Sequence, residues 1–248
     1  MATVNTVAIL QTRMTSTRLP GKVLRPICGI PALQLQVERV RRAKMLDGIV
    51  IATTIHATDN PVCDIATAMG VPFHRGSEDD VLSRYIGAAA MTTATHVVRL
   101  TGDCPLADPA IIDRVVGALF ETGADYASNT LERTYPIGMD VEAFSRAALD
   151  RAGAEAARSD EREHVTPFIY RHPEQFRLHN VAARDGERHP HLRLTLDTDE
   201  DLRLIVAIYE GLYADNPKFS LSDILAFLAR HPGLLEINRD VPHKWLET

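Results

Sequence analysis

Residues 7–24 read VAILQTRMTSTRLPGKVL, a short apolar run that gives way to a polar loop. The run from Val7 to Gln11 is aliphatic and partly β-branched, which is typical of a buried strand. The loop after it carries two arginines, one lysine, four hydroxyl side chains and a Pro-Gly turn. A basic loop directly after a first strand predicts an α/β protein with an anion site at that strand's carboxyl end.

Strand-like and helix-like patterns continue to alternate after this loop. The runs GIVIAT (48–53) and HVVRL (96–100) predict two more buried strands. Helices are expected over 32–46, 61–69, 79–92 and 109–122, and the last opens with Asp108 as N-cap and Pro109 at its first position. Such alternation indicates a mainly parallel sheet with helices on both faces. Ligands should then bind just after Leu10, Thr53 and Leu100.

In the second half of the chain, strands and helices no longer alternate regularly. Residues 124–143 predict a strand, a polar loop and a second strand, with helices following over 144–157 and 160–171. Further strands are expected at 176–181 and 192–197, and further helices at 199–213 and 221–230. We expect one domain spanning 1–248, with a lid-like or dimer-forming insertion over roughly 125–180.

The composition is that of an ordinary globular enzyme. Of 248 residues, 45% are hydrophobic and 24% charged, and the net charge is −6, which argues against disorder and against a nucleic-acid partner. No apolar run approaches the roughly 20 residues of a membrane span, and the start of the chain does not resemble a signal peptide. We therefore expect a cytoplasmic protein with neither a nucleic-acid nor a membrane partner.

Three basic side chains make the first loop a candidate triphosphate site. Arg13, Arg18 and Lys22 could hold phosphates together with backbone N–H groups. The loop is not a Walker A motif, because Ser16 stands where that motif needs its first glycine. A solvated basic loop is the alternative interpretation.

Two carboxylates are candidate ligands for a hard cation. Asp103, in RLTGDCPLADP, follows a predicted strand and could reach Mg²⁺. In LTLDTDEDL, Thr198 is a good N-cap, and the acids at 199–201 suit the first turn of a helix. Asp197 is the acid that this structural interpretation leaves unexplained.

Taken together, the motifs resemble the cytidylyltransferases of the spore-coat polysaccharide biosynthesis type, relatives of the CMP-sialate, CMP-pseudaminate and CMP-Kdo synthetases. The matching segments, in the family's order, are ILQTRMTSTRLPGKVL, RLTGDCPLADP, YPIGMDVEAFS, REHVTPFIY, RLTLDTDEDL and EIN. The resemblance implies a single GT-A-like, Rossmann-like nucleotidyltransferase domain with a mixed, mostly parallel sheet. It also implies a Mg²⁺-dependent enzyme, a homodimer that meets through residues around 125–175, and CTP and a small acidic acceptor as substrates.

The resemblance also assigns roles to individual residues. Asp103 and Asp197 would hold Mg²⁺, while Arg13 and Lys22, with Arg18 nearby, would hold the triphosphate. The backbone of Leu10 and Gln11, with Thr53 and Thr101 near the strand ends, would read the cytosine edge. The acceptor pocket would include Tyr135, Gly138, Asp140, Arg162 and His164. Thr15 departs from the family, which usually has glycine there.

Three functions fit these assignments. The first is transfer of CMP from CTP to a sugar acid, of the 2-keto-3-deoxy type or a related acceptor, with release of pyrophosphate for a surface polysaccharide or glycoconjugate. The second replaces the sugar with a non-sugar acceptor such as a phosphonate. The third is a non-catalytic nucleotide-sugar-binding protein, against which the two retained acids argue. His164, beside Glu163, is either a general base or a polar contact near a helix start.

Overall fold

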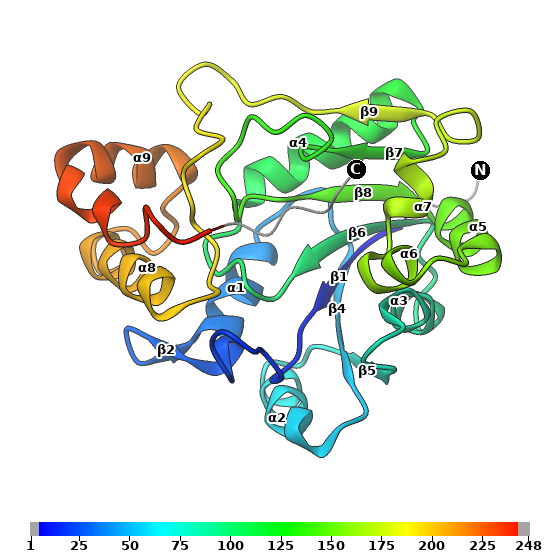
Figure 1. Ribbon diagram of the computed structural model, residues 1–248, viewed down its shortest axis with the longest axis horizontal. Helices are drawn as coiled ribbons and strands as arrows, with labels where there is room; N and C mark the ends of the chain where they lie inside the picture. Colours follow the sequence, from blue (N-terminus) through cyan, green and yellow to red (C-terminus); the bar gives the residue numbers. More distant parts are fainter. Residues whose placement is uncertain (1–4, 243–248) are drawn as a thin grey trace.

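The computed structural model describes residues 5–242, and within them a seven-stranded sheet runs in the order β5-β4-β1-β6-β8-β7-β9 (Figure 1). The strands of this sheet are β1 (Thr6–Gln11), β4 (Gly48–Thr54), β5 (Phe73–Gly76), β6 (His96–Thr101), β7 (Tyr126–Ser128), β8 (Glu142–Ser145) and β9 (Leu178–Asn180). A small hairpin, β2 (Pro26–Ile27) and β3 (Ile30–Pro31), lies apart from it. Strands β5, β4, β1 and β6 are parallel, and β8 enters antiparallel between β6 and β7. The sheet is therefore mixed and mostly parallel, as the sequence predicts.

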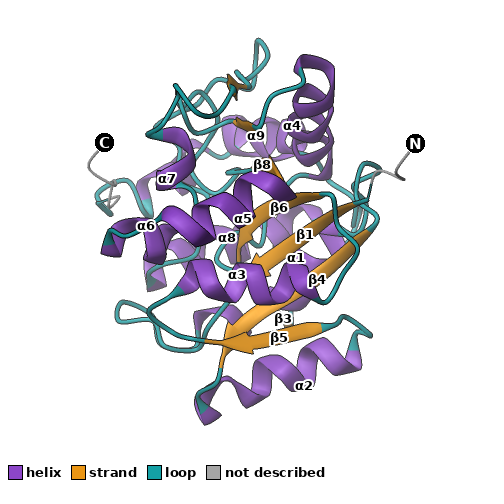
Figure 2. Ribbon diagram, turned by 90° about the vertical axis from the view of Figure 1, so that its right-hand side faces the viewer, coloured by secondary structure: helices purple, strands orange, loops and turns teal. Residues whose placement is uncertain are grey.

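Helices cover both faces of the sheet, which confirms the second part of that prediction. They are α1 (Ala32–Val40), α2 (Asn60–Ala68), α3 (Val81–Ala90), α4 (Pro109–Thr122), α5 (Arg146–Glu155), α6 (Ser159–His164), α7 (Pro167–Tyr170), α8 (Asp199–Leu212) and α9 (Leu221–Arg230). Helices α1, α2, α4, α8 and α9 pack into one apolar core, and α3, α5 and α7 into the other. Figure 2 shows α3 and α5 lying across the second face.

Strand β1 explains why the molecule has two cores. Its side chains alternate, so that Ala8 and Leu10 belong to one core and Val7 and Ile9 to the other. All four are buried. A strand covered on both faces reads as a continuous apolar run, which is what residues 7–10 show. No helix within residues 5–242 has both the length and the apolar character needed to cross a membrane.

The structure corrects three details of the expected elements. Residues 192–197 are not a strand of the sheet but an extended segment with one isolated bridge, between Ile137 and Arg193. The helix expected over 160–171 is broken into α6 and α7 at Val165, whose φ of 75° no helix permits. The helix expected over 32–46 ends at Val40. Strand β5 and the β2–β3 hairpin were not predicted.

Candidate active site

The basic loop and the Asp103 turn leave the sheet side by side. Gln11 at the end of β1 pairs in register with Thr101 at the end of β6, so the two following loops start next to each other. A cavity of about 260 Å³ opens between them. It is lined by Gln11, Thr12, Arg13, Thr15, Ser16, Thr17, Arg18, Lys22, Val23, Thr101, Gly102, Asp103 and Asp197. Seven of the predicted site residues thus meet at the carboxyl edge of the sheet, the expected place for a ligand.

Lys22 joins the two acids that the sequence singles out. Its Nζ donates to Asp103 Oδ2 at 2.7 Å and to Asp197 Oδ1 at 2.6 Å. Lys22 opens a short 3₁₀ helix, Lys22–Leu24, after Gly21, whose φ is 68°. The three side chains are 14%, 25% and 12% exposed, so the cluster is largely shielded but still reached by solvent. Two carboxylates that converge on one ammonium mark the place where a cation is stabilised.

The charges at this cluster shift the pKa values of its members. Burial alone would raise the pKa of the Asp103 carboxyl, but the adjacent Lys22 ammonium draws that pKa below its usual range. Burial alone would lower the pKa of Lys22, but the charges of Asp103 and Asp197 raise it above its ordinary value. At neutral pH the cluster therefore holds a charged lysine and an ionised Asp103.

Backbone contacts rather than a sheet ladder bring Asp197 to the cavity. Leu194 N donates to Ile137 O at 2.8 Å, and Leu196 N donates to Asp103 O at 2.7 Å. Gly138 permits this packing, because its φ is 99° and a Cβ would come within 2.6 Å of the Leu194 carbonyl carbon. Gly138 therefore shapes the site from behind, whereas the resemblance assigned it to the acceptor pocket.

Asp59 and Glu78 hold the basic loop, and sequence reasoning missed both. Asp59 is fully buried and accepts hydrogen bonds from Met14 N at 2.8 Å and Thr53 Oγ1 at 2.9 Å. Glu78 accepts from Arg13 at 3.0 Å and also from Thr15. Both acids follow β4 in the sequence and are 45 and 65 residues from Met14 and Arg13, their partners in the loop. No local motif in the loop therefore predicts that they contact it. Thr15 has no left-handed φ, so its position does not depend on the family's glycine.

Two polar atoms beside the cavity have no hydrogen-bond partner among the described residues. They are Gln11 Oε1 and Thr12 Oγ1, both buried. Gly102 lies against the Thr12 side chain, because a Cβ at this position would be 2.7 Å from Thr12 Oγ1. Buried polar groups are normally paired, so unpaired ones beside a cavity indicate hydrogen bonds reserved for a ligand.

Leu10 and Thr53, which the resemblance assigned to the cytosine, do not line the cavity. The side chain of Leu10 is buried in a core, whereas the prediction concerned its backbone, and the Thr53 hydroxyl donates to Asp59. Thr101 and Gln11 do line the cavity.

The residues assigned to the acceptor pocket are spread over several places. Tyr135 is fully buried and accepts from Arg114 at 2.6 Å. Arg162 pairs with Asp80 of the α3 N-cap, 2.5 Å away. His164 ends α6, and burial lowers the pKa of its imidazole, which disfavours the charged form.

Asp140 forms a two-point ion pair with Arg133, at 2.6 and 2.9 Å. Burial raises the pKa of the Cys104 thiol, and the charges of Asp103 and Asp140 raise it further. Asp140 and Asp103 are therefore both within electrostatic range of Cys104. This brings the Arg133–Asp140 pair to the neighbourhood of the proposed reacting centre.

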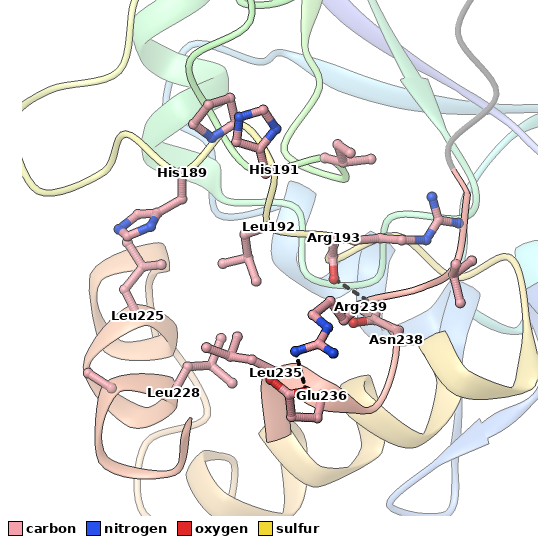
Figure 3. A pocket seen from close by; sticks show the side chains of 14 residues that line it. His189, His191, Leu192, Arg193, Leu225, Leu228, Leu235, Glu236, Asn238 and Arg239 are labelled. Atoms are coloured by element: carbon pink, nitrogen blue, oxygen red, sulfur yellow. Dashed lines mark hydrogen bonds and ion pairs between the residues drawn. The ribbon is translucent and has the colours of Figure 1, made fainter. Parts of the chain in front are cut away.

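A larger cavity, about 600 Å³, lies elsewhere and shares no lining residue with the smaller one (Figure 3). Leucines from α9 and from the segment after it form much of its wall, and the exposed His189 and His191 stand at its edge. Among residues 5–242 no group of three or more His, Cys, Asp or Glu side chains is arranged to hold a metal. The smaller cavity, with its paired acids and basic loop, is the better candidate for catalysis.

A mixed sheet, a basic loop after β1 and two acids that meet at its lysine define the class of α/β nucleotidyltransferases. Residues 7–220 match the family described as Cytidylyltransferase, and the chain belongs to that family. It is 37% identical over 229 residues to the spore coat polysaccharide biosynthesis protein SpsF of Bacillus subtilis. The matched region covers 90% of this chain and 94% of SpsF.

Solved structures agree with this assignment. A cytidylyltransferase from Leptospira borgpetersenii superposes with a TM-score of 0.89 at 31% identity, covering 97% of this chain and all of that one. The fold also matches a CMP:2-keto-3-deoxy-manno-octonic acid synthetase complexed with CTP, with a TM-score of 0.61 at 16% identity over 84% of this chain and 99% of that one. The family and the nucleotidyltransferase fold predicted from the sequence are therefore confirmed.

Proposed function

We propose that the protein transfers CMP from CTP to the hydroxyl of a sugar acid and releases pyrophosphate. The observation that carries this proposal is the convergence of Asp103 and Asp197 on Lys22, with 2.7 and 2.6 Å contacts, at the mouth of the basic loop. Phosphoryl-type transfer needs positioning and charge neutralisation more than a covalent nucleophile. The cavity supplies basic side chains that can neutralise phosphate charge and two carboxylates that can position the reacting groups.

The loop side chains are suited to the triphosphate. Arg13, Arg18 and Lys22 all line the cavity. In our proposal Lys22 and Arg13 hold the β- and γ-phosphates and so stabilise the pyrophosphate as it leaves. Arg13 exchanges its contact with Glu78 for one with phosphate. The unpaired atoms of Gln11 and Thr12 then supply hydrogen bonds to the cytosine edge.

The donor atoms of the acid pair fit a divalent cation. Asp103 and Asp197 offer only oxygen, and Mg²⁺ in nucleotide enzymes is held by one or two carboxylates together with substrate phosphates and water. The Lys22 ammonium lies where their oxygens meet, which marks a favourable place for positive charge. We propose that these two acids hold Mg²⁺. A structure of another protein of this fold, Rv0371C of Mycobacterium tuberculosis, is described as a complex with manganese.

The residues then divide the work of the reaction. When bound, the ion supplies charge neutralisation at the α-phosphate and lowers the pKa of an oxygen ligand. The acceptor hydroxyl attacks the α-phosphorus in line, the bond to the pyrophosphate oxygen breaks, and the hydroxyl proton leaves to solvent. Asp103 and Asp197 orient the reacting groups. Lys22 and Arg13 hold the pyrophosphate in place and stabilise its negative charge as it leaves.

The acceptor side of the proposal rests on charge and on relatives. SpsF is named for polysaccharide biosynthesis, and the CTP-bound synthetase of the same fold for a 2-keto-3-deoxy sugar acid. Arg133 pairs with Asp140 and lies within electrostatic range of Cys104, the residue that follows Asp103, and we propose that it attracts the carboxylate of a sugar-acid acceptor. We also propose a homodimer that meets through residues around 125–175, which light scattering after gel filtration tests.

Pyrophosphate release with CTP, UTP, ATP or GTP and a panel of sugar acids and phosphonates tests the reaction. We expect release with CTP and a sugar acid. Rates measured against Mg²⁺ concentration for Asp103→Asn, Asp197→Asn and the double variant test the site. Each single variant should lose most activity and need more metal, and the double variant should be little worse, because residues acting as a unit are not additive.

Asp199→Asn is the matched control for these variants. Asp199 lies two residues from Asp197 in the first turn of α8, is 71% exposed and pairs only loosely with Arg25, at 3.5 Å. It should keep the wild-type rate and metal dependence. If Asp197→Asn behaves like Asp199→Asn, Asp197 belongs to the helix start and the proposed metal site is wrong.

A further inference from the structure

Asp201 makes more contacts than its place in a helix requires. It is the third residue of α8 and completes a capping box with Thr198, the N-cap. That function needs only the bond from Thr198 N to Asp201 Oδ2, at 3.1 Å. Yet Asp201 is fully buried and also accepts from Asp197 N at 2.9 Å and from Asn238 Nδ2 at 2.9 Å.

The strongest of the extra contacts comes from Arg193. Its Nε donates to Asp201 Oδ1 at 2.8 Å and its Nη2 to Asp201 Oδ2 at 2.9 Å, so the pair is bidentate. The Arg193 side chain is only 4% exposed. Asn238 bonds to the Arg193 carbonyl as well, and Figure 3 shows the two residues joined in this way. A planar guanidinium held at two points by a buried carboxylate has little rotational freedom.

Arg193 also contacts Asp197. The same Nη2 donates to Asp197 Oδ2 at 2.8 Å. The other oxygen of Asp197, Oδ1, is the one that meets Lys22 at 2.6 Å. Arg18 also pairs with Oδ2, at 3.0 Å, but its side chain is 34% exposed, whereas the Asp201–Arg193 pair is buried. The buried pair thus holds the Asp197 carboxylate with Oδ1 directed toward Lys22, which also contacts Asp103.

We infer that Asp201 and Arg193 are positioning residues that orient Asp197 toward the reacting centre. The inference rests on the proposed function, in which Asp197 holds the divalent ion. Residues behind a metal ligand commonly determine its orientation, and their loss typically costs roughly 10–100-fold in metal affinity. Asp201 therefore combines two functions, one for the helix and one for the site.

The chain contains a matched control for this double function. Asp223 is the third residue of α9 and completes a capping box with Ser220, accepting from Ser220 N at 2.7 Å. Within residues 5–242 its side chain bonds only to Ser220, and it lies in a different helix. Asp201→Asn and Asp223→Asn therefore remove the same kind of helix contact, but only the first loosens Arg193.

The test measures Mn²⁺ binding by electron paramagnetic resonance in the presence of CTP, without acceptor, and urea unfolding of each variant. Asp201→Asn should bind Mn²⁺ about tenfold or more weaker than wild type, whereas Asp223→Asn, which loses only the helix contact, should bind it normally. With acceptor added, Asp201→Asn should lower kcat while KM for CTP changes little, because the phosphate loop is untouched.

Arg193→Lys provides a second route if Asp201→Asn is too unstable to study. Lysine keeps the charge but cannot bridge two carboxylates with a planar fork, so the loss of Mn²⁺ affinity should be similar. If Asp201→Asn or Arg193→Lys binds Mn²⁺ as wild type does, while Asp197→Asn does not, the positioning inference is overturned and the metal site stands. If Asp197→Asn itself binds Mn²⁺ normally, the proposed metal site fails first.

Discussion

Lys22 is the residue on which the site depends most. In the structure it neutralises two carboxylates, and in the proposed reaction it holds the leaving phosphates. These two functions alternate: nucleotide and metal together must replace the ammonium between the acids. The lysine therefore keeps Asp103 and Asp197 close together before substrate arrives.

Replacing Lys22 should separate these functions. We expect Lys22→Ala to stay folded and to lose turnover by on the order of a hundredfold or more, the scale seen when one charge-stabilising donor is removed. Without the ammonium the two acids repel each other, so Mn²⁺ should raise Tm more in this variant than in wild type. Scanning calorimetry with and without Mn²⁺ measures this. Lys44→Ala, at an exposed lysine, is the control, and equal metal shifts in all three proteins would contradict the prediction.

The pKa shifts at the cluster predict how its contribution to stability varies with pH. The Asp103 carboxyl has a lowered pKa in the folded protein, so the unfolded chain takes up the proton first as pH falls. The stabilisation is complete above the unfolded value of about 4 and is lost below it. The raised pKa of Lys22 keeps its charge until well into the alkaline range. In urea unfolding, the difference in free energy of unfolding between wild type and Lys22→Ala should be largest from about pH 6 to 9. It should decrease below about pH 4.

At the scale of elements, Asp108 illustrates a residue that supports the fold without joining the chemistry. Its side chain caps α4 by accepting from Ala110 N at 2.8 Å, and it also accepts from Leu221 N of α9 at 2.6 Å. We expect Asp108→Ala to lower the free energy of unfolding by about 2–3 kcal/mol, from a lost cap and an unpaired buried amide. Urea unfolding measures the loss. Activity and Mg²⁺ dependence, assayed at low temperature, should stay close to wild type, and a changed metal dependence would place Asp108 in the site.

Elements with local signals could be predicted from the sequence. Helix α4 runs over Pro109–Thr122 as expected, because its cap, its first-turn proline and its apolar spacing are all local. The segment 192–197 misled the prediction because LRLTLD alternates as a strand does. Its alternation instead arises because its apolar side chains enter the core while Arg193, Thr195 and Asp197 face polar partners.

Only the site residues that lie within a recognisable sequence motif could be predicted. Arg13, Lys22 and Asp103 stand in segments whose composition signals an anion or a cation. Asp59, which holds the Met14 amide, is 45 residues from its partner, and Arg193 was not considered at all. Side chains that act through others carry no local signature, because their function appears only when distant segments are packed together.

For the whole molecule, the choice of nucleotide should appear in its stability. A ligand that binds only the folded protein stabilises it by about 2.7 kcal/mol at a hundredfold excess over Kd. We expect CTP with Mg²⁺ to raise Tm more than UTP, ATP or GTP, because Gln11 and Thr12, which line the cavity, each carry a buried polar atom that we propose pairs with the cytosine edge. Thermal shift assays with each nucleotide measure this. Equal shifts with all four would contradict cytosine recognition.

The order in which the chain is made also matters for the Lys22 cluster. Lys22 and Asp197 are 175 residues apart in the sequence, and contacts between such distant residues form late in folding. A growing polypeptide on the ribosome that has not yet reached Asp197 can form the Lys22–Asp103 contact but lacks the second acid. If Asp197 holds the metal as we propose, half-made or half-folded copies do not consume CTP. In refolding, recovered catalysis reports the arrival of the last segments, after most of the parallel sheet has formed.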